Sequence, residues 1–158
     1  PGVPGAQPAL RLGRHAHGAA TLADASYHAW RTTTASTVRV VEVFIGGEAT
    51  ASTVNRMSVR RLSTNAGTPT DIAPGPLNPL SAVSVSQSYS AATTGPTIAS
   101  TSHLLNLAMN AFGGIIRWVA APGEELWFTA QTAPSGQGLV DSISGTGIVS
   151  TTVIFEEM

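Results

Sequence analysis

Short runs in which apolar and polar residues alternate recur along the chain, and Gly- and Pro-rich segments separate them. The clearest run is AVSVSQSYSA, residues 82–91, in which Val83, Val85, Gln87 and Tyr89 alternate with four serines. Side chains that follow one another on a strand point to opposite faces of the sheet. The run therefore predicts a half-buried strand whose outer face carries hydroxyl groups.

The segment STVRVVEVFIGG, residues 36–47, is rich in β-branched residues and ends in two glycines. Its apolar residues change faces at the adjacent Val40 and Val41, so both faces of the expected strand carry apolar side chains. This pattern indicates a central strand or a β-bulge. The segment NRMSVRRLS, residues 55–63, alternates until it slips at Arg61, where we also expect a bulge.

The segment SHLLNLAMNAF, residues 102–112, fits both a helical stripe and a period of two. We interpret it as a strand because its neighbours are β-like and the chain is poor in helix formers such as Lys and Glu. The ending GIVSTTVIFEEM, residues 147–158, predicts a closing strand that is paired into a sheet. Residues 65–80 and 133–147 are rich in Gly or Pro and are expected to be loops.

The stretch RWVAAPGEELWF, residues 117–128, has an apolar run on each side of a Pro-Gly pair. Proline presets φ for the first central position of a turn, and glycine suits a second position where φ is positive. The stretch predicts a β-hairpin with large buried areas on its tryptophans and a pair between Arg117 and Glu125 across the strands. The candidate packing and interface residues are Trp118, Trp127, Arg117, Glu125 and Tyr89.

These patterns amount to about seven or eight short strands with Gly- and Pro-rich connections, which is typical of an all-β, antiparallel β-sandwich, jelly-roll-like in kind. The length of 158 residues suits one domain. Residues 1–20 hold three Pro, four Gly and five Ala without an apolar period. We therefore expect an extended or flexible N-terminal arm over 1–20 and a single β-sandwich domain over 21–158.

Charged residues make up only 11% of the chain, against roughly 25% in ordinary soluble domains. Two compatible explanations are that much of the surface lies against other protein, or that serine and threonine coat a β-protein. The net charge of −1 gives no attraction to nucleic acid or to an acidic membrane, so neither is expected as a partner. No apolar run approaches 18 residues, and no secretory signal pattern is present.

Motifs for catalysis or cofactor binding are missing from the sequence. The lack of cysteine excludes disulfides and thiolate metal sites, and the lack of lysine excludes a P-loop. No G-x-S-x-G stretch marks a nucleophilic serine. We therefore expect no enzymatic activity, no cofactor and no metal.

Several isolated residues have both a functional and a plain structural interpretation. His15 and His17 would share one side of an extended segment about 7 Å apart, which is a metal-ligand arrangement. They lack a third ligand, so solvated histidines are the favoured interpretation. Asp24 and His28 would form a catalytic triad with a serine only through a geometry that sequence does not supply.

Two further features have both a functional and a structural interpretation. Asp141 lies in a Gly-rich segment, where one acid without D-x-D spacing indicates a turn more than a calcium site. Arg56, Arg60 and Arg61 form the basic cluster of the chain, and no aromatic residues that would stack on bases lie between them. The cluster is interpreted as a charged edge strand that is protected from aggregation.

Two stretches of the C-terminal third stand out together, LLNLAMNAFGGIIRWVAAPGEELWF and the ending VSTTVIFEEM, with a Gly-rich segment between them. They resemble small virion proteins of tailed bacteriophages, which have a segment of the style N-x-x-G-x-x-R-W-x-A-x-P-G-E-E and a closing strand that ends in F-E-E. The matching residues are Asn110, Gly113 or Gly114, Arg117, Trp118, Pro122, Gly123, Glu124 and Glu125.

The resemblance implies a β-sandwich without catalysis, often trimeric, that serves as a capsid decoration (cement) protein. The expected partners are further copies of the chain, as a homotrimer, and the major capsid protein or other virion proteins. The expected location is the virion, assembled in the host cytoplasm. Three alternatives stay open: a tail- or fibre-associated protein; a carbohydrate- or receptor-binding sandwich with Tyr89, Trp118, Trp127 or Trp30 stacked on sugars; and a hydrolase on a sandwich scaffold.

Overall fold

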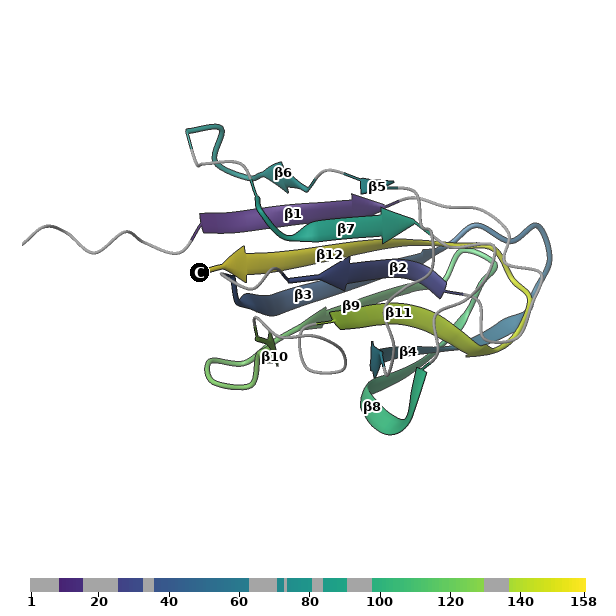
Figure 1. The fold of residues 1–158 in the computed structure, drawn as a ribbon. Coiled ribbons are helices and arrows are strands. Elements are labelled where there is room, and N and C mark those ends of the chain that lie inside the picture. Colours follow the sequence, from purple (N-terminus) through teal and green to yellow (C-terminus); the bar gives the residue numbers. More distant parts are fainter. Residues whose placement is uncertain are drawn as a thin grey trace, which may run out of the picture.

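Twelve strands in two antiparallel sheets make up the part of the chain that the computed structural model describes, and no helix occurs in that part (Figure 1). The described residues are 9–15, 26–32, 36–62, 71–72, 74–80, 84–90, 98–129 and 137–158. The strands are β1 (Ala9–His15), β2 (Ser26–Arg31), β3 (Val38–Gly47), β4 (Val54–Leu62), β5 (Asp71–Ile72), β6 (Gly75–Pro76), β7 (Gln87–Ser90), β8 (Ile98–Asn110), β9 (Ile115–Val119), β10 (Leu126–Phe128), β11 (Gln137–Ser144) and β12 (Val149–Glu157).

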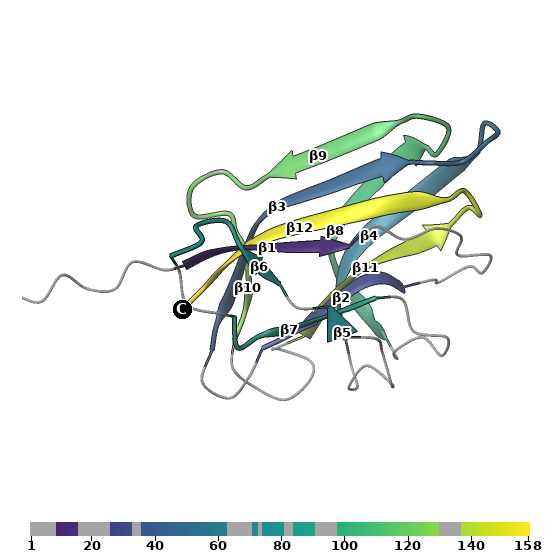
Figure 2. The same cartoon turned by 90° about the horizontal axis from the view of Figure 1, so that it is seen from above.

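The first sheet has the order β10-β3-β12-β1-β6, with β9 also paired to β3, and the second has the order β5-β7-β2-β11-β4-β8. Figure 2 shows the two sheets as layers of one sandwich. Strands β1 to β4 alternate between the sheets, and β9, β11 and β12 do so again. The predicted all-β, antiparallel sandwich is therefore confirmed.

One apolar core fills the space between the sheets. The first sheet contributes Val40, Val43 and Phe155 among others, and the second contributes Met57 and Val59. Across the layers the rings of Trp30 and Phe128 meet edge to face, with centroids 5.0 Å apart. Each fully buried large apolar side chain stabilises the fold by about 1.5–3 kcal/mol, so facing sheets hold each other in place.

Strand β3 confirms both features expected around Val40 and Val41. It lies between β12 on one side and β9 and β10 on the other, so it is central. Its register with β12 shifts, because Ile154 pairs with Glu42 whereas Phe155 pairs with Val40. Val41 is left without a partner on β12. Because of this bulge, Val40 before it and Val43 after it both face the core.

Strands β4 and β8 also form where they were expected, and their register shifts on both sides of Arg60. The interpretation of β4 as a charged edge strand was wrong, because β4 lies between β11 and β8. Arg60 is buried at 7% exposure. Its guanidinium forms a buried ion pair with Asp141 on β11.

The Gly-rich loop expected over 133–147 was also wrong, because residues 137–144 are the central strand β11 of the second sheet. Gly138 occupies a position in β11 where packing leaves no room for a side chain. A Cβ atom at Gly138 would lie 2.4 Å from the Trp30 ring and 2.5 Å from the Phe128 ring. The glycine therefore marks a close approach of aromatic rings and not a turn.

The run over 82–91 forms a shorter strand than expected, β7 over Gln87–Ser90. Just before this strand, the valine expected to be buried is exposed and the serine expected to be exposed is buried. Val85 is 58% exposed, whereas Ser86 is buried. Ser86 lies inward because Glu157 accepts hydrogen bonds from its backbone N, at 2.7 Å, and from its hydroxyl. Tyr89 lies in β7, where its Cα pairs with Ala29 and Asp71, and its side chain lies outside the described residues.

Part of the predicted N-terminal arm is a strand of the first sheet. Residues 9–15 form β1, which pairs with β12 along its whole length and with β6. The expected domain boundary between residues 20 and 21 lies outside the described residues, as do His17 and Asp24. The closing strand over 147–158 is confirmed, with β12 paired on both sides.

Candidate interaction surface

Strands β9 and β10 form one edge of the first sheet. Both run antiparallel to β3: β9 pairs with residues 42–46 and β10 pairs with residues 38–40. Between them the backbone N of Ala120 still donates to the Val41 carbonyl at 2.9 Å. Together they amount to one edge strand, interrupted by a loop over residues 121–125 at the level of the β3 bulge.

The hairpin expected over 117–128 was wrong, because β9 and β10 pair with β3 and not with each other. The turn itself is confirmed. Gly123 has a φ of 88°, and the backbone N of Glu124 donates to the Ala121 carbonyl at 2.9 Å. With Pro122 ahead of the glycine, this is the type II geometry that the Pro-Gly pair predicts.

The expected pair between Arg117 and Glu125 was also wrong, because each residue has a partner on β3. Nε of Arg117 donates to Oε1 of Glu42 at 2.8 Å, and Nη2 donates to Oε2 at 3.1 Å. This two-point contact lowers the pKa of the Glu42 carboxyl and raises that of Arg117, chiefly through the hydrogen bonds. The paired charges largely neutralise each other on the outer face.

Arg39 on β3 contacts several side chains at the β10 end of this edge. Its Nε donates to Glu156 at 2.8 Å, its Nη1 lies 3.6 Å from Oε1 of Glu125, and its guanidinium carbon lies 5.5 Å from the Trp127 ring centroid. The pKa of Glu125 is lowered, first by the backbone N–H groups of Glu125 and Gly123 and then by the charge of Arg39. The two carboxylates hold the Arg39 guanidinium, and the guanidinium lies over the Trp127 ring as a cation–π contact.

Exposure separates the candidate residues. Ile115, Val119 and Trp127 are 68%, 55% and 41% exposed, and they lie along the β9–β10 edge. Trp118 points inward and packs against the core, as does the fully buried Trp30. The structure thus brings Trp127, Arg117 and Glu125 to one surface and assigns Trp118 to packing. Sequence reasoning missed Arg39 and Glu42, because their partners lie more than 70 residues away along the chain.

A second polar cluster lies within the second sheet. Nε of Arg60 lies 3.0 Å from Oδ1 of Asp141, and Oγ of Ser58 lies 3.0 Å from Nδ1 of His103. A serine and a histidine at this distance match a nucleophile and its base. However, Ser58 has no exposed surface and its hydroxyl donates to the Leu105 carbonyl at 2.9 Å. The cluster therefore joins strands and offers no open nucleophile.

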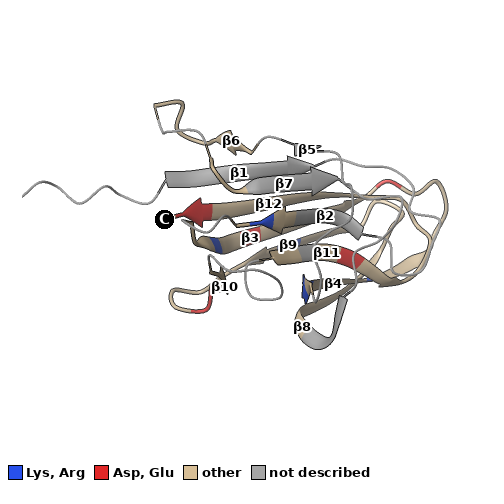
Figure 3. Ribbon diagram, in the orientation of Figure 1, with Lys and Arg blue, Asp and Glu red and all other residues tan. Residues whose placement is uncertain are grey.

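Charges are sparse along the described ribbon (Figure 3), and no group of three His, Asp or Glu residues in the described part is placed to hold a metal ion. Asp141 is neither a turn residue nor part of such a group, since it is buried in β11 against Arg60. In the same part of the chain no helix is long and apolar enough to span a membrane.

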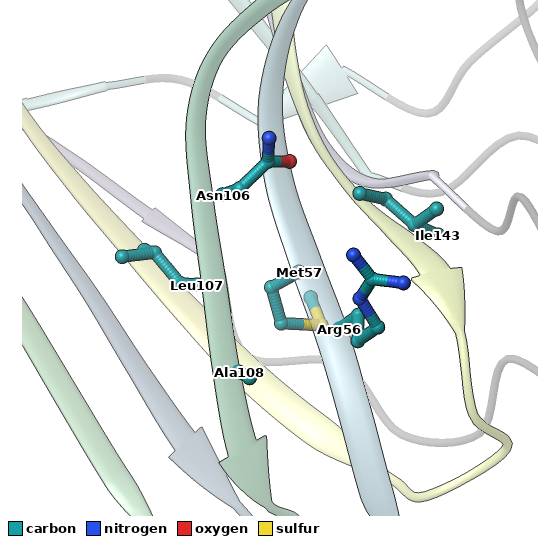
Figure 4. Close-up of a pocket in the computed structure, with 6 residues that line it drawn as sticks. All are labelled: Arg56, Met57, Asn106, Leu107, Ala108 and Ile143. Carbon is teal, nitrogen blue, oxygen red and sulfur yellow. The ribbon is translucent and has the colours of Figure 1, made fainter.

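A pocket of about 140 Å³ opens on the second sheet between β4, β8 and β11 (Figure 4). Arg56 and Ile143 lie side by side at its rim, and Leu107 points to the other side of β8. The pocket is hollow at this point because the residue opposite Arg56 on β8 is the small Ala108. Its six lining residues are Arg56, Met57, Asn106, Leu107, Ala108 and Ile143.

No known protein family, no curated protein and no solved structure matches this chain. Among the described residues, the β9–β10 edge is an open sheet edge with exposed apolar side chains between neutralised ion pairs.

Proposed function

We propose that the chain is a structural protein of a bacteriophage particle, which binds and stabilises the capsid surface as an oligomeric decoration protein and catalyses no reaction. The observation that carries this proposal is the apolar row of Ile115, Val119 and Trp127 on the open β9–β10 edge. Protein interfaces are enriched in aromatic residues and arginine and are depleted of unpaired charge at their centres. The edge has this composition.

The strand order supports the same proposal. The order β1-β12-β3-β9 in one sheet, opposite β2-β11-β4-β8 in the other, is the arrangement that we assign to a jelly roll, with β5, β6 and β7 inserted between β4 and β8. Viral capsid domains are among the proteins that use this architecture. This is an analogy of fold, and the edge surface supplies the chemical argument.

The mechanism is adhesion. Arg117 and Arg39 reach the edge already paired with Glu42 and Glu156, so docking does not strip water from isolated charges. Burying the apolar row against a capsid subunit supplies the favourable free energy. Because the protein binds the assembled shell and not its separated subunits, mass action shifts the equilibrium away from disassembly.

The test is sedimentation with particles of the phage whose genome encodes the chain, prepared without it. The native protein is expected to sediment with the particles to saturation, and Trp127→Ser should weaken this binding at least about tenfold. Leu80→Ser is the matched control, because Leu80 is 91% exposed but lies in the segment after β6, away from the edge. Native protein that stays in the supernatant at every concentration would overturn the proposal.

The exposed ring of Trp127 also favours the second candidate, a receptor- or carbohydrate-binding sandwich on a tail or fibre. A sugar ring stacks on an exposed tryptophan face. Against this candidate, Trp30 is buried and Trp118 faces the core, so the described tryptophans form no planar row. A change of tryptophan emission on addition of surface glycans of the host would support it, and unchanged emission together with capsid binding would exclude it.

A further inference from the structure

Arg56 differs from the other arginines whose side chains the structure describes. Arg39, Arg60, Arg61 and Arg117 each donate to a carboxylate or a carbonyl, and Arg31 also has an interaction partner. The backbone of Arg56 has a partner residue on each side, Ser144 on β11 and Ala108 on β8. Its side chain has no hydrogen bond, ion pair or ring contact within the described part of the chain. It stands exposed at the rim of the pocket in Figure 4.

The pocket around Arg56 has the chemistry of a carboxylate site. The amide of Asn106, which also has no partner within the described residues, lines the same hollow, and Ile143 provides an apolar wall. A guanidinium binds a carboxylate at two points, and an amide N–H adds a third donor.

The chain itself carries an acid suited to this site. Glu124 is exposed at the end of the turn that begins at Ala121, and its carboxylate has no hydrogen bond or ion pair within the described residues. The other acids near this edge, Glu42, Glu125 and Glu156, are already paired with arginines. Glu48 is a second exposed acid with no side-chain hydrogen bond or ion pair among the described residues, and it lies outside the turn. Glu124 projects from the turn, and Arg56 lies in a hollow.

These two groups do not meet within one chain. The turn lies next to β10, and β10 pairs with the start of β3. The start of β3 also pairs with the C-terminal end of β12, so the turn lies at that end of the sandwich. Arg56 lies at the opposite end of the sandwich, next to Asn55, whose amide donates to the Gly147 carbonyl between β11 and β12 at 2.7 Å. Figure 1 shows the turn between β9 and β10 and the beginning of β4 on different parts of the molecule. A contact between them needs a second copy.

We propose that Glu124 of one copy binds in the Arg56 pocket of a second copy, so that copies associate head to tail. Such a contact joins two different surfaces, and repeated contacts of this kind close into a ring when the rotation allows it. This inference rests on the proposed function, since it supplies the oligomer that would dock on a capsid. It assigns the Arg56 pocket to self-association and leaves the β9–β10 edge for the capsid.

The experiment is sedimentation velocity of the native chain and of charge-reversed variants. R56E and E124R should each weaken self-association at least about tenfold, because like charges then face each other. The double variant R56E/E124R, which restores opposite charges, should associate to within about threefold of the native chain. E48R is the matched control, because Glu48 is an exposed acid outside the turn, and it should associate like the native chain. Raising the salt concentration should weaken the native association.

A native chain that stays monomeric, an E124R variant that associates normally, or a double variant that fails to recover would each overturn the inference. Sedimentation with capsids, measured separately, distinguishes this failure from failure of the proposed function. A monomer that still binds capsids overturns the self-association alone. A ring that does not bind capsids overturns the decoration function alone.

Discussion

Nε of Arg60 on β4 lies 3.0 Å from Oδ1 of Asp141 on β11, and the two side chains are 9% and 0% exposed. This ion pair joins two neighbouring strands in the middle of the second sheet. A buried charge is tolerated because its partner and its hydrogen bonds replace the lost water. Removing one partner leaves the other charge uncompensated.

We therefore expect Asp141→Ala to lower the free energy of unfolding by about 3–5 kcal/mol, measured by urea denaturation. Arg60→Ala should fall in the same range. Glu48→Ala is the control, and it should stay within about 0.5 kcal/mol of the native chain because the Glu48 side chain is exposed and has no partner within the described residues. A loss below about 1 kcal/mol for Asp141→Ala would contradict the structural role of the pair.

Thr151 offers a stabilising substitution. Its side chain points into the core from β12, and its Oγ1 has no hydrogen-bond partner within the described residues. A buried hydroxyl without a partner costs about 1–3 kcal/mol, and valine has nearly the same shape. Thr151→Val should therefore raise the free energy of unfolding by about 1 kcal/mol. Ser150→Ala, on the outward face of the same strand, should change it little, and destabilisation by Thr151→Val would show that the hydroxyl has a partner.

Gly138 should not accept a side chain. A Cβ atom at this position would lie 2.4 Å from the Trp30 ring and 2.5 Å from the Phe128 ring, and both rings are buried. Gly138→Ala is expected to cost about 1–3 kcal/mol and to alter the near-ultraviolet circular dichroism of the ring pair. Gly75→Ala is the control, because nothing lies within 4 Å of its added methyl group. Equal stability of both variants would contradict the packing.

The sequence predicts those features of the fold that depend on neighbouring residues. The alternation in β12, the bulge at Val41 and the turn at Gly123 all follow from the local pattern of apolar residues, Pro and Gly. The two arms around that turn were expected to pair with each other because a tight turn usually joins paired strands. They pair with β3 instead. This pairing depends on β3 residues that lie about 75 positions earlier in the sequence.

The mistaken loop and the mistaken strand face have the same kind of cause. Gly138 lies in the segment 133–147, which was expected to be a loop, but the glycine is required by Trp30 and Phe128 from distant parts of the sequence. Ser86 was placed on the solvent face, but Glu157, 71 residues later, supplies a buried acceptor for its backbone and hydroxyl. Local periodicity shows where strands lie, whereas tertiary partners decide which polar side chains are buried.

The last prediction concerns acid. The pKa of Glu42 lies below its ordinary value of 4.5 because Arg117 donates two hydrogen bonds to the carboxylate. A group whose pKa is lower in the folded state binds its proton more readily when the chain is unfolded. Its contribution to stability is therefore present above pH 4.5 and is lost as the pH falls through the lowered folded value.

Titration of the side-chain carboxyl carbons by NMR should give a pKa for Glu42 below 4.5, and Arg117→Gln should raise that value. The same variant should leave the lowered pKa of Glu125 in place, because backbone N–H groups and Arg39 cause that shift. Screening should reduce the Glu42 shift in high salt, since the Arg117 side chain is 63% exposed. If Glu42 titrates at its ordinary pKa in the native chain, the fork between Arg117 and Glu42 does not persist in solution, and the β9–β10 edge then carries an unpaired cation.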